Sequence, residues 1–92
     1  MITNDSEYIQ LDDTNNYFYS HDIGLIAYLL CKNFEVFSLD KTVKNKVLFI
    51  MKRKKNKSID KAVKQYWDCK TCVDAQNFFN QLKRLKNQIF SA

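Results

Sequence analysis

The sequence predicts an α+β domain, in which three helices pack on a small antiparallel sheet of about three strands. Short apolar or alternating runs of strand length are bounded by polar turns, whereas three other segments repeat apolar residues at helical spacing. The chain has 92 residues, 46% of them apolar, which is enough for one folded domain. Taken in order, the segments read β-α-β-β-α-α.

The first half of the domain begins with a short aromatic strand, YFYS, at residues 17–20. Ser20 and Asp22 are both suited to cap a helix, because a side-chain oxygen can accept a hydrogen bond from a free backbone N–H. The apolar residues that follow at helical spacing are Ile23, Ile26, Ala27 and Leu30. We expect this helix to end near residues 31–33, where Asn33 can adopt the left-handed conformation.

Two further strands are predicted at residues 34–39 and 47–53, joined into a hairpin by the polar residues 40–46. The second of these strands contains an unbroken apolar run from Val47 to Met51. Because such runs are typical of strands that are covered on both faces, we expect this strand to be the central one.

Two helices complete the predicted domain. Ser58 is the expected cap of the first, whose apolar stripe is Ile59, Ala62, Val63, Tyr66 and Trp67. Thr71 and Asp74 form a variant of the capping box before the second. The apolar stripe of that helix is Ala75, Phe78, Phe79, Leu82, Leu85 and Ile89. We expect the aromatic side chains of both stripes to lie in the core.

Charge is distributed unevenly along the chain. The net charge is +5, but residues 1–40 contribute −6 and residues 41–92 contribute +11. We interpret residues 1–16 as an acidic tail and residues 17–92 as the folded domain. The apolar runs are far shorter than the ~18 residues needed to span a bilayer, and the N-terminus lacks the pattern of a secretory signal. We therefore expect a cytoplasmic protein that does not enter membranes.

The middle of the chain is rich in lysine, which predicts an anionic partner. The candidate binding residues are Lys41, Lys44, Lys46, Lys52, Arg53, Lys54, Lys55, Lys57, Lys61 and Lys64. We expect them to form one continuous exposed surface, set apart from the carboxylates of residues 1–40. Such a surface suits the phosphate backbone of a nucleic acid. One alternative is that the lysines bind an acidic protein surface. The other is that they form a solvated loop that protects the hairpin from aggregation. Lys outnumbers Arg by thirteen to two, which argues against sequence-specific recognition.

The motifs of catalysis and metal binding are weak. With a single glycine, Gly24, the chain has no glycine-rich phosphate loop. Cys69 and Cys72 have metal-ligand spacing, but His21 and Cys31 lie at opposite ends of a helix of ~15 Å and cannot both join them. We expect these two cysteines to be partly buried where one helix ends and the next begins. The sequence predicts neither an enzyme nor a metal or other cofactor.

Several short stretches resemble a small domain family of unknown function, with members in bacteria, phages and other mobile elements. They are Ser20-His21-Asp22, Ala27-Tyr28-Leu29, Phe34, Val47-Leu48-Phe49, Tyr66-Trp67, Phe78-Phe79, Leu82-Lys83 and Leu85-Lys86. The resemblance covers roughly residues 17–90. It implies a stand-alone module that acts by binding, and it supplies no catalytic residue.

Together these features predict a small non-enzymatic binding protein of mobile-element or phage type, which engages nucleic acid or a nucleic-acid-handling protein. The alternative is an inhibitor or adaptor, for example a phage-encoded antagonist of a host defence enzyme, whose acidic N-terminus imitates nucleic acid. Strand alternation places either Phe18 or the pair Tyr17 and Tyr19 on the outer face of the sheet. An exposed aromatic ring beside the basic residues would strengthen the nucleic-acid hypothesis.

Overall fold

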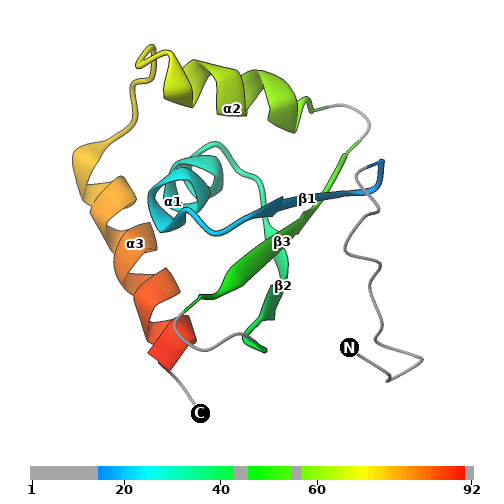
Figure 1. The fold of residues 1–92 in the computed structure, drawn as a ribbon. Coiled ribbons are helices and arrows are strands. Elements are labelled where there is room, and N and C mark those ends of the chain that lie inside the picture. The colour runs from blue at the N-terminus through cyan, green and yellow to red at the C-terminus, as the bar shows by residue number, and fades with distance from the viewer. Residues whose placement is uncertain (1–14, 43–45, 55–56, 91–92) are drawn as a thin grey trace.

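The computed structural model describes residues 15–42, 46–54 and 57–90. Its elements are β1 (Tyr17–Ser20), α1 (Ile23–Cys31), β2 (Val36–Asp40), β3 (Leu48–Lys52), α2 (Ile59–Trp67) and α3 (Ala75–Phe90) (Figure 1). This arrangement confirms the predicted α+β class and the order β-α-β-β-α-α. Most of the predicted acidic tail lies outside the described residues. At its end, the carbonyl of Asn16 accepts a hydrogen bond from the backbone N–H of Arg53 at 2.9 Å.

The sheet is antiparallel with the strand order β1-β3-β2, so β3 is the central strand, as predicted. Three successive side chains of β3 are buried, namely Phe49, Ile50 and Met51. Because successive side chains of a strand point to opposite faces, this pattern requires that both faces of the sheet are covered at β3.

A bulge interrupts the pairing of β2 with β3. Val36 lies opposite Met51 and Ser38 lies opposite Ile50, so Phe37 is an extra residue without a partner of its own. The extra residue lets Val36 and Leu39, three positions apart, both contact the core on the helical side of the sheet. Phe37 is consequently left on the opposite face together with Ser38.

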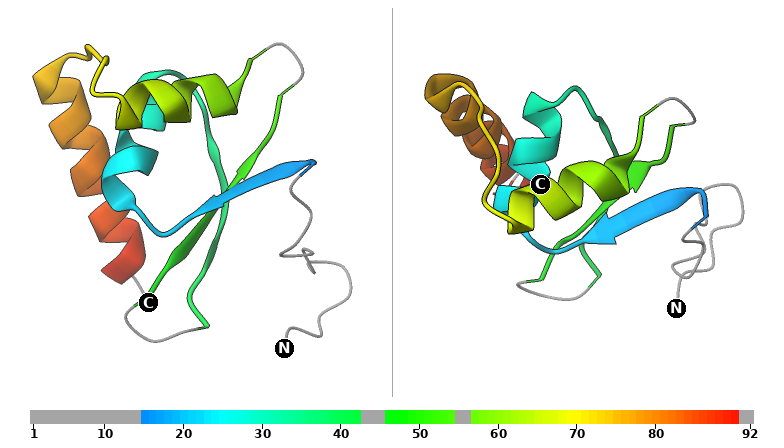
Figure 2. Two further views of the ribbon diagram at one scale, coloured as in Figure 1. Left: turned by 45° about the horizontal axis from the view of Figure 1, so that its top comes forward. Right: turned by 90° about the horizontal axis from the view of Figure 1, so that it is seen from above.

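All three helices lie on one side of the sheet, with α1 between α2 and α3 (Figure 2). Residues 25–29 of α1 are all buried, which is typical of a helix that is surrounded by other elements. The core that α1 organises includes Phe49 and Met51 from β3, Ile59 from α2 and Leu85 from α3. Among the described helices, none is both long and apolar enough to cross a membrane.

The caps of the first two helices agree with the sequence. Asp22 Oδ1 accepts from Leu25 N at 3.0 Å, while Ser20 Oγ accepts from Asp22 N at 3.1 Å. Ser58 caps α2 by accepting from the backbone N–H of Lys61. Asn33 has a φ of 71°, so it takes the left-handed position that was expected after α1.

The predicted cap of α3 was wrong. The cap is Asp74, whose carboxylate accepts from Asn77 N at 2.8 Å, because α3 begins only at Ala75. Thr71 lies earlier, in the irregular connection after α2, and is exposed.

The expectation that every aromatic residue of the two stripes lies in the core was also wrong. Tyr66 and Phe78 pack against the core, but the exposed fractions of Trp67 and Phe79 are 59% and 56%. Helical residues advance by about 100° each, so Trp67 is rotated about 80° from the buried Ile59, and Phe79 about 120° from the buried Leu85. These two rings therefore point away from α1.

Candidate functional site

The predicted basic residues that flank β3 lie at two separate ends of the sheet, whereas Lys61 and Lys64 lie on α2. Lys41 follows β2 and Lys46 precedes β3, so both belong to the hairpin end, whereas Lys52 and Lys54 lie at the other end of β3. A strand rises about 3.3 Å per residue, which puts Lys46 and Lys52 about 20 Å apart along the chain. The lysines that flank β3 therefore do not gather at one end of the sheet. Lys44 and Lys55 lie outside the described residues.

Several of these side chains are already engaged within the molecule. Arg53 Nη1 lies 3.1 Å from Asp60 Oδ2, and Lys64 Nζ lies 3.1 Å from Asp68 Oδ2. Both carboxylates belong to the second half of the chain, so these two ion pairs do not involve the acids of residues 1–40. Lys57 Nζ donates to the carbonyl of Lys32 at 2.6 Å, and Lys41 Nζ to the carbonyl of Gln88 at 2.8 Å. The other described members of the set are exposed and have no carboxylate within ion-pair distance among the described residues: Lys46, Lys52, Lys54 and Lys61.

The face of the sheet opposite the helices carries aromatic side chains. Tyr17 pairs with Lys52 and Tyr19 pairs with Ile50, so these residues share that face, while Phe18 packs against the core on the other face. The bulge adds Phe37 to the same face. We call the group formed by Tyr17, Tyr19, Phe37 and Lys52 the outer aromatic face.

The rings of the outer aromatic face contact one another. The centroid of Tyr17 is 6.4 Å from that of Tyr19 and 5.5 Å from that of Phe37, with interplanar angles near 40°. Lys52 Nζ lies 5.8 Å from the centroid of Phe37. Half of the Phe37 side chain is exposed, whereas Ile50 on the same face is only 3% exposed. Rings from both edge strands thus flank a buried central residue.

This arrangement combines two chemical groups that bind single-stranded nucleic acid. An exposed ring offers a π face on which a base can stack, a contact worth about 1–3 kcal/mol. A lysine ammonium beside it can approach the phosphate that links that base to the next one. Lys presents a point charge rather than a rigid fork, so a contact of this kind does not distinguish one base sequence from another.

Sequence reasoning left open whether Phe18 or the two tyrosines face outward, and it missed Phe37. A signal for Phe37 was present in the stretch VFSL at residues 36–39. Val36 and Leu39 are both apolar and three positions apart, which breaks the two-residue alternation of a regular strand. Such a break indicates a bulge, and the bulge determines the face to which Phe37 belongs.

The histidine and the cysteines have local contacts. His21 Nδ1 lies 2.9 Å from the carbonyl oxygen of Val47. Cys69 and Cys72 are exposed in the connection between α2 and α3 rather than partly buried, which corrects that expectation. Burial raises the pKa of the Cys31 thiol, so this thiol is less reactive than a solvated one. Among the described residues, no three His, Cys, Asp or Glu side chains gather as a metal site requires.

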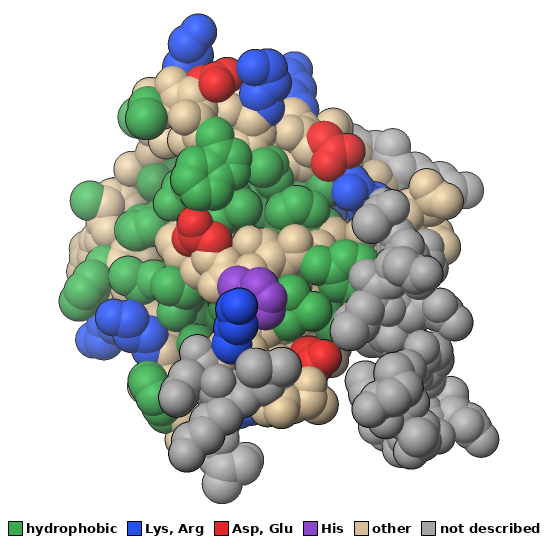
Figure 3. Space-filling view, viewed as in Figure 1, with side chains coloured by type: hydrophobic (Ala, Val, Ile, Leu, Met, Phe, Trp, Pro, Cys, Tyr) green, Lys and Arg blue, Asp and Glu red, His purple; other side chains and the backbone are tan. Residues whose placement is uncertain are grey.

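A second exposed surface is apolar. Figure 3 shows hydrophobic side chains gathered below α2 and along α3. Trp67 forms an edge-on contact with Tyr66 at 5.0 Å between centroids, and Lys83 Nζ lies 5.4 Å from the centroid of Phe79. Exposed large aromatic residues of this kind are common in protein-binding surfaces.

Comparison with known proteins places the chain in a family without assigning an activity. Residues 15–91 match the family model described as "Domain of unknown function (DUF5659)". The chain belongs to this family. No curated protein and no solved structure matches it significantly. Any functional assignment must therefore come from the geometry of the domain itself.

Proposed function

We propose that this protein is a non-enzymatic module that binds single-stranded nucleic acid on the outer aromatic face. The observation that supports this proposal is the cluster of three rings on the side of the sheet without helices, with the Lys52 ammonium 5.8 Å from the half-exposed Phe37. A sheet whose exposed aromatic residues stack successive bases is a recurring solution for binding single strands.

The charge of the chain favours the first encounter with a polyanion. The net charge is +5, and Lys54 adds a second exposed ammonium just beyond the outer aromatic face. Long-range attraction of this kind raises the rate of association and weakens as salt increases. Once the strand is bound, stacking on Phe37 and its neighbours supplies the part of the affinity that salt does not remove.

The geometry favours a single strand over a duplex. A base can stack on Phe37 or Tyr17 only if one of its own faces is free, whereas in a duplex each face is covered by the neighbouring base pair. Together with the family resemblance, this supports a stand-alone cytoplasmic module of mobile-element or phage origin that acts on exposed single strands.

The proposal is tested by fluorescence anisotropy with labelled strands of about 12 nucleotides, of DNA and of RNA, and with the corresponding duplex. At about 50 mM salt, where electrostatic contacts are strongest, the single strands should bind more tightly than the duplex. Absence of binding to both single strands under these conditions would refute the proposal.

Substitution of lysines tests the location of the site. Lys52→Gln should lower the dependence of log K on log salt by about 0.7, the value for one phosphate contact with a single strand. Lys83→Gln is the matched control, because Lys83 is also exposed and also lies beside a phenylalanine ring, Phe79, but on α3. Equal effects of the two substitutions would show that binding depends on total charge and not on the outer aromatic face.

A protein partner is the second candidate, and the exposure of Trp67 and Phe79 supports it. Inhibitors and adaptors bind through such rings, which are enriched among the residues that dominate binding energy. In this case Trp67→Ala should abolish the capture of a partner from the native host and leave nucleic-acid affinity unchanged. The acidic segment proposed to imitate nucleic acid lies almost entirely outside the described residues.

A further inference from the structure

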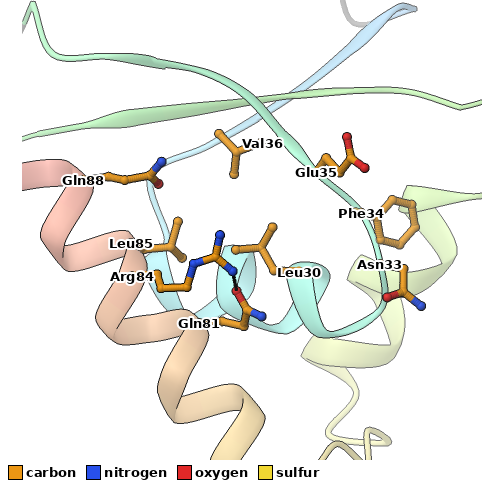
Figure 4. Close-up of a pocket in the computed structure, with 9 residues that line it drawn as sticks. All are labelled: Leu30, Asn33, Phe34, Glu35, Val36, Gln81, Arg84, Leu85 and Gln88. Atoms are coloured by element: carbon orange, nitrogen blue, oxygen red, sulfur yellow. Dashed lines mark hydrogen bonds between the residues drawn. The ribbon is translucent and has the colours of Figure 1, made fainter.

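A cavity of about 450 Å³ lies on the helical side of the sheet, between the end of α1, the start of β2 and the second half of α3 (Figure 4). Its apolar wall consists of Leu30, Val36 and Leu85, together with Phe34. The polar lining residues are Asn33, Glu35, Gln81, Arg84 and Gln88. Its volume falls within the range of pockets that hold small ligands, and its mixture of apolar and polar groups is typical of them.

Arg84 is held in position by a short chain of hydrogen bonds along α3. Gln81 Nε2 donates to Asn77 Oδ1 at 3.3 Å, and Arg84 Nη1 donates to Gln81 Oε1 at 3.2 Å. The second of these bonds is drawn in Figure 4, where the guanidinium reaches into the cavity from α3. A side chain that is already oriented loses less conformational freedom when it binds a ligand.

The positive charge of Arg84 is not neutralised within the described part of the chain. The two ion pairs there are formed by Arg53 with Asp60 and by Lys64 with Asp68. Glu35 lines the opposite side of the cavity and does not pair with Arg84. A guanidinium has five N–H donors in a planar fork, and this fork matches the two oxygens of a carboxylate.

We propose that this cavity binds a small carboxylate that carries an apolar body. The carboxylate accepts hydrogen bonds from Arg84, and the apolar body packs on Leu30, Val36 and Leu85. The C-terminal residue of a peptide and a free aliphatic acid share this chemistry. The site lies on the opposite side of the sheet from the outer aromatic face, so this proposal is independent of nucleic-acid binding.

Three probes distinguish the sources of the ligand. N-acetyl-leucine represents the end of a peptide, hexanoate represents a free acid, and N-acetyl-leucinamide has the apolar body without the charge. Each is titrated into the full chain while the backbone amide signals are followed by NMR. For molecules of this size we expect a Kd of about 1 mM for at least one carboxylate, with shifts at residues 33–36 and 81–88. The amide probe should bind at least about tenfold more weakly.

The relative affinities of the two acids identify the natural class. Tighter binding of N-acetyl-leucine assigns the cavity to peptide ends, and tighter binding of hexanoate assigns it to free acids. Equal binding of N-acetyl-leucine and N-acetyl-leucinamide would overturn the proposal, as would the absence of saturable shifts at these residues up to about 20 mM.

Substitutions on α3 supply a matched control. Arg84→Gln and Lys86→Gln each remove one positive charge from an exposed position of the same helix. Arg84→Gln should weaken carboxylate binding by at least about tenfold, and Lys86→Gln should leave it unchanged. Glu35→Gln removes the carboxylate on the other wall and should tighten binding. If Arg84→Gln and Lys86→Gln weaken binding equally, the guanidinium does not hold the ligand.

Discussion

The role of Phe37 can be tested by truncating its ring while leaving the charges of the protein unchanged. Phe37→Ala removes the most exposed ring of the outer aromatic face and retains Lys52 beside it. Phe79→Ala is the control, because Phe79 matches Phe37 in exposure and in its distance from a lysine. Phe79 is 56% exposed against 50% for Phe37, and its nearest lysine nitrogen lies 5.4 Å from the ring centroid against 5.8 Å.

The expected magnitude follows from the number of bases that can stack on the ring. A half-exposed Phe37 offers one face, and loss of one stacked base costs about 1–3 kcal/mol. The affinity for a single strand should therefore fall by about 5- to 150-fold. The contact of Phe37 with Tyr17, 5.5 Å between centroids, contributes about 0.5–1.5 kcal/mol to folding. Because a domain typically has 5–15 kcal/mol of stability, the variant should still fold.

The assay is fluorescence anisotropy with a labelled single strand at about 50 mM salt, repeated at about 200 mM. Phe37→Ala should lower affinity at both salt concentrations by the same factor, because stacking is not screened. Circular dichroism of each variant verifies that the fold is retained. The reasoning is refuted if Phe79→Ala weakens binding as much as Phe37→Ala, or if neither does so while the wild type binds.

Three further predictions concern the tail, the hairpin and α1. Removal of residues 1–14 raises the net charge from +5 to +9, since four acids and no base are lost, and should tighten polyanion binding at low salt in the same anisotropy assay. Thr42 donates hydrogen bonds to Asp40 and thereby lowers the pKa of the Asp40 carboxyl. The wild type should therefore be more stable than Asp40→Asn above pH 3.8, and this advantage should disappear as the pH falls through the folded-state pKa. Urea unfolding of both proteins at successive pH values measures the difference in stability. A Cβ on Gly24 would lie 2.9 Å from the Tyr66 hydroxyl, so Gly24→Ala should lower the Tm. Adding Tyr66→Phe removes the hydroxyl and should restore most of the lost Tm. An unchanged Tm in Gly24→Ala alone would contradict this account.

The predictions from sequence succeeded where short-range chemistry decides the structure. The caps Asp22 and Ser58 depend only on residues within one helical turn. The central position of β3 follows from the unbroken apolar run, because only a strand covered on both faces can bury Phe49, Ile50 and Met51 together. These features need no knowledge of distant neighbours.

The predictions failed where the position of an element distant in the sequence determines which side chains are buried and which lie close together. The apolar stripe of a helix is about 100° wide, so Trp67 and Phe79 fit the apolar pattern of their helices. The core, however, covers only the centre of each stripe, and both rings are exposed. Lysines close together in sequence were assumed to be close in space, but the length of β3 separates Lys46 from Lys52. The cavity beside Arg84 is lined by residues of α1, β2 and α3 that are far apart in the sequence, so no local pattern indicates it.

The bulge in β2 has a consequence for how this surface tolerates insertions and deletions. Val36 and Leu39 are three positions apart, so both can contact the core only with a bulge between them. Deletion of Phe37 alone would bring them two positions apart, so a regular ladder would again direct both of them inward. The packing of the core therefore does not require a residue at position 37. Loss of the single codon for Phe37 would leave the domain able to fold and would remove one ring from the outer aromatic face.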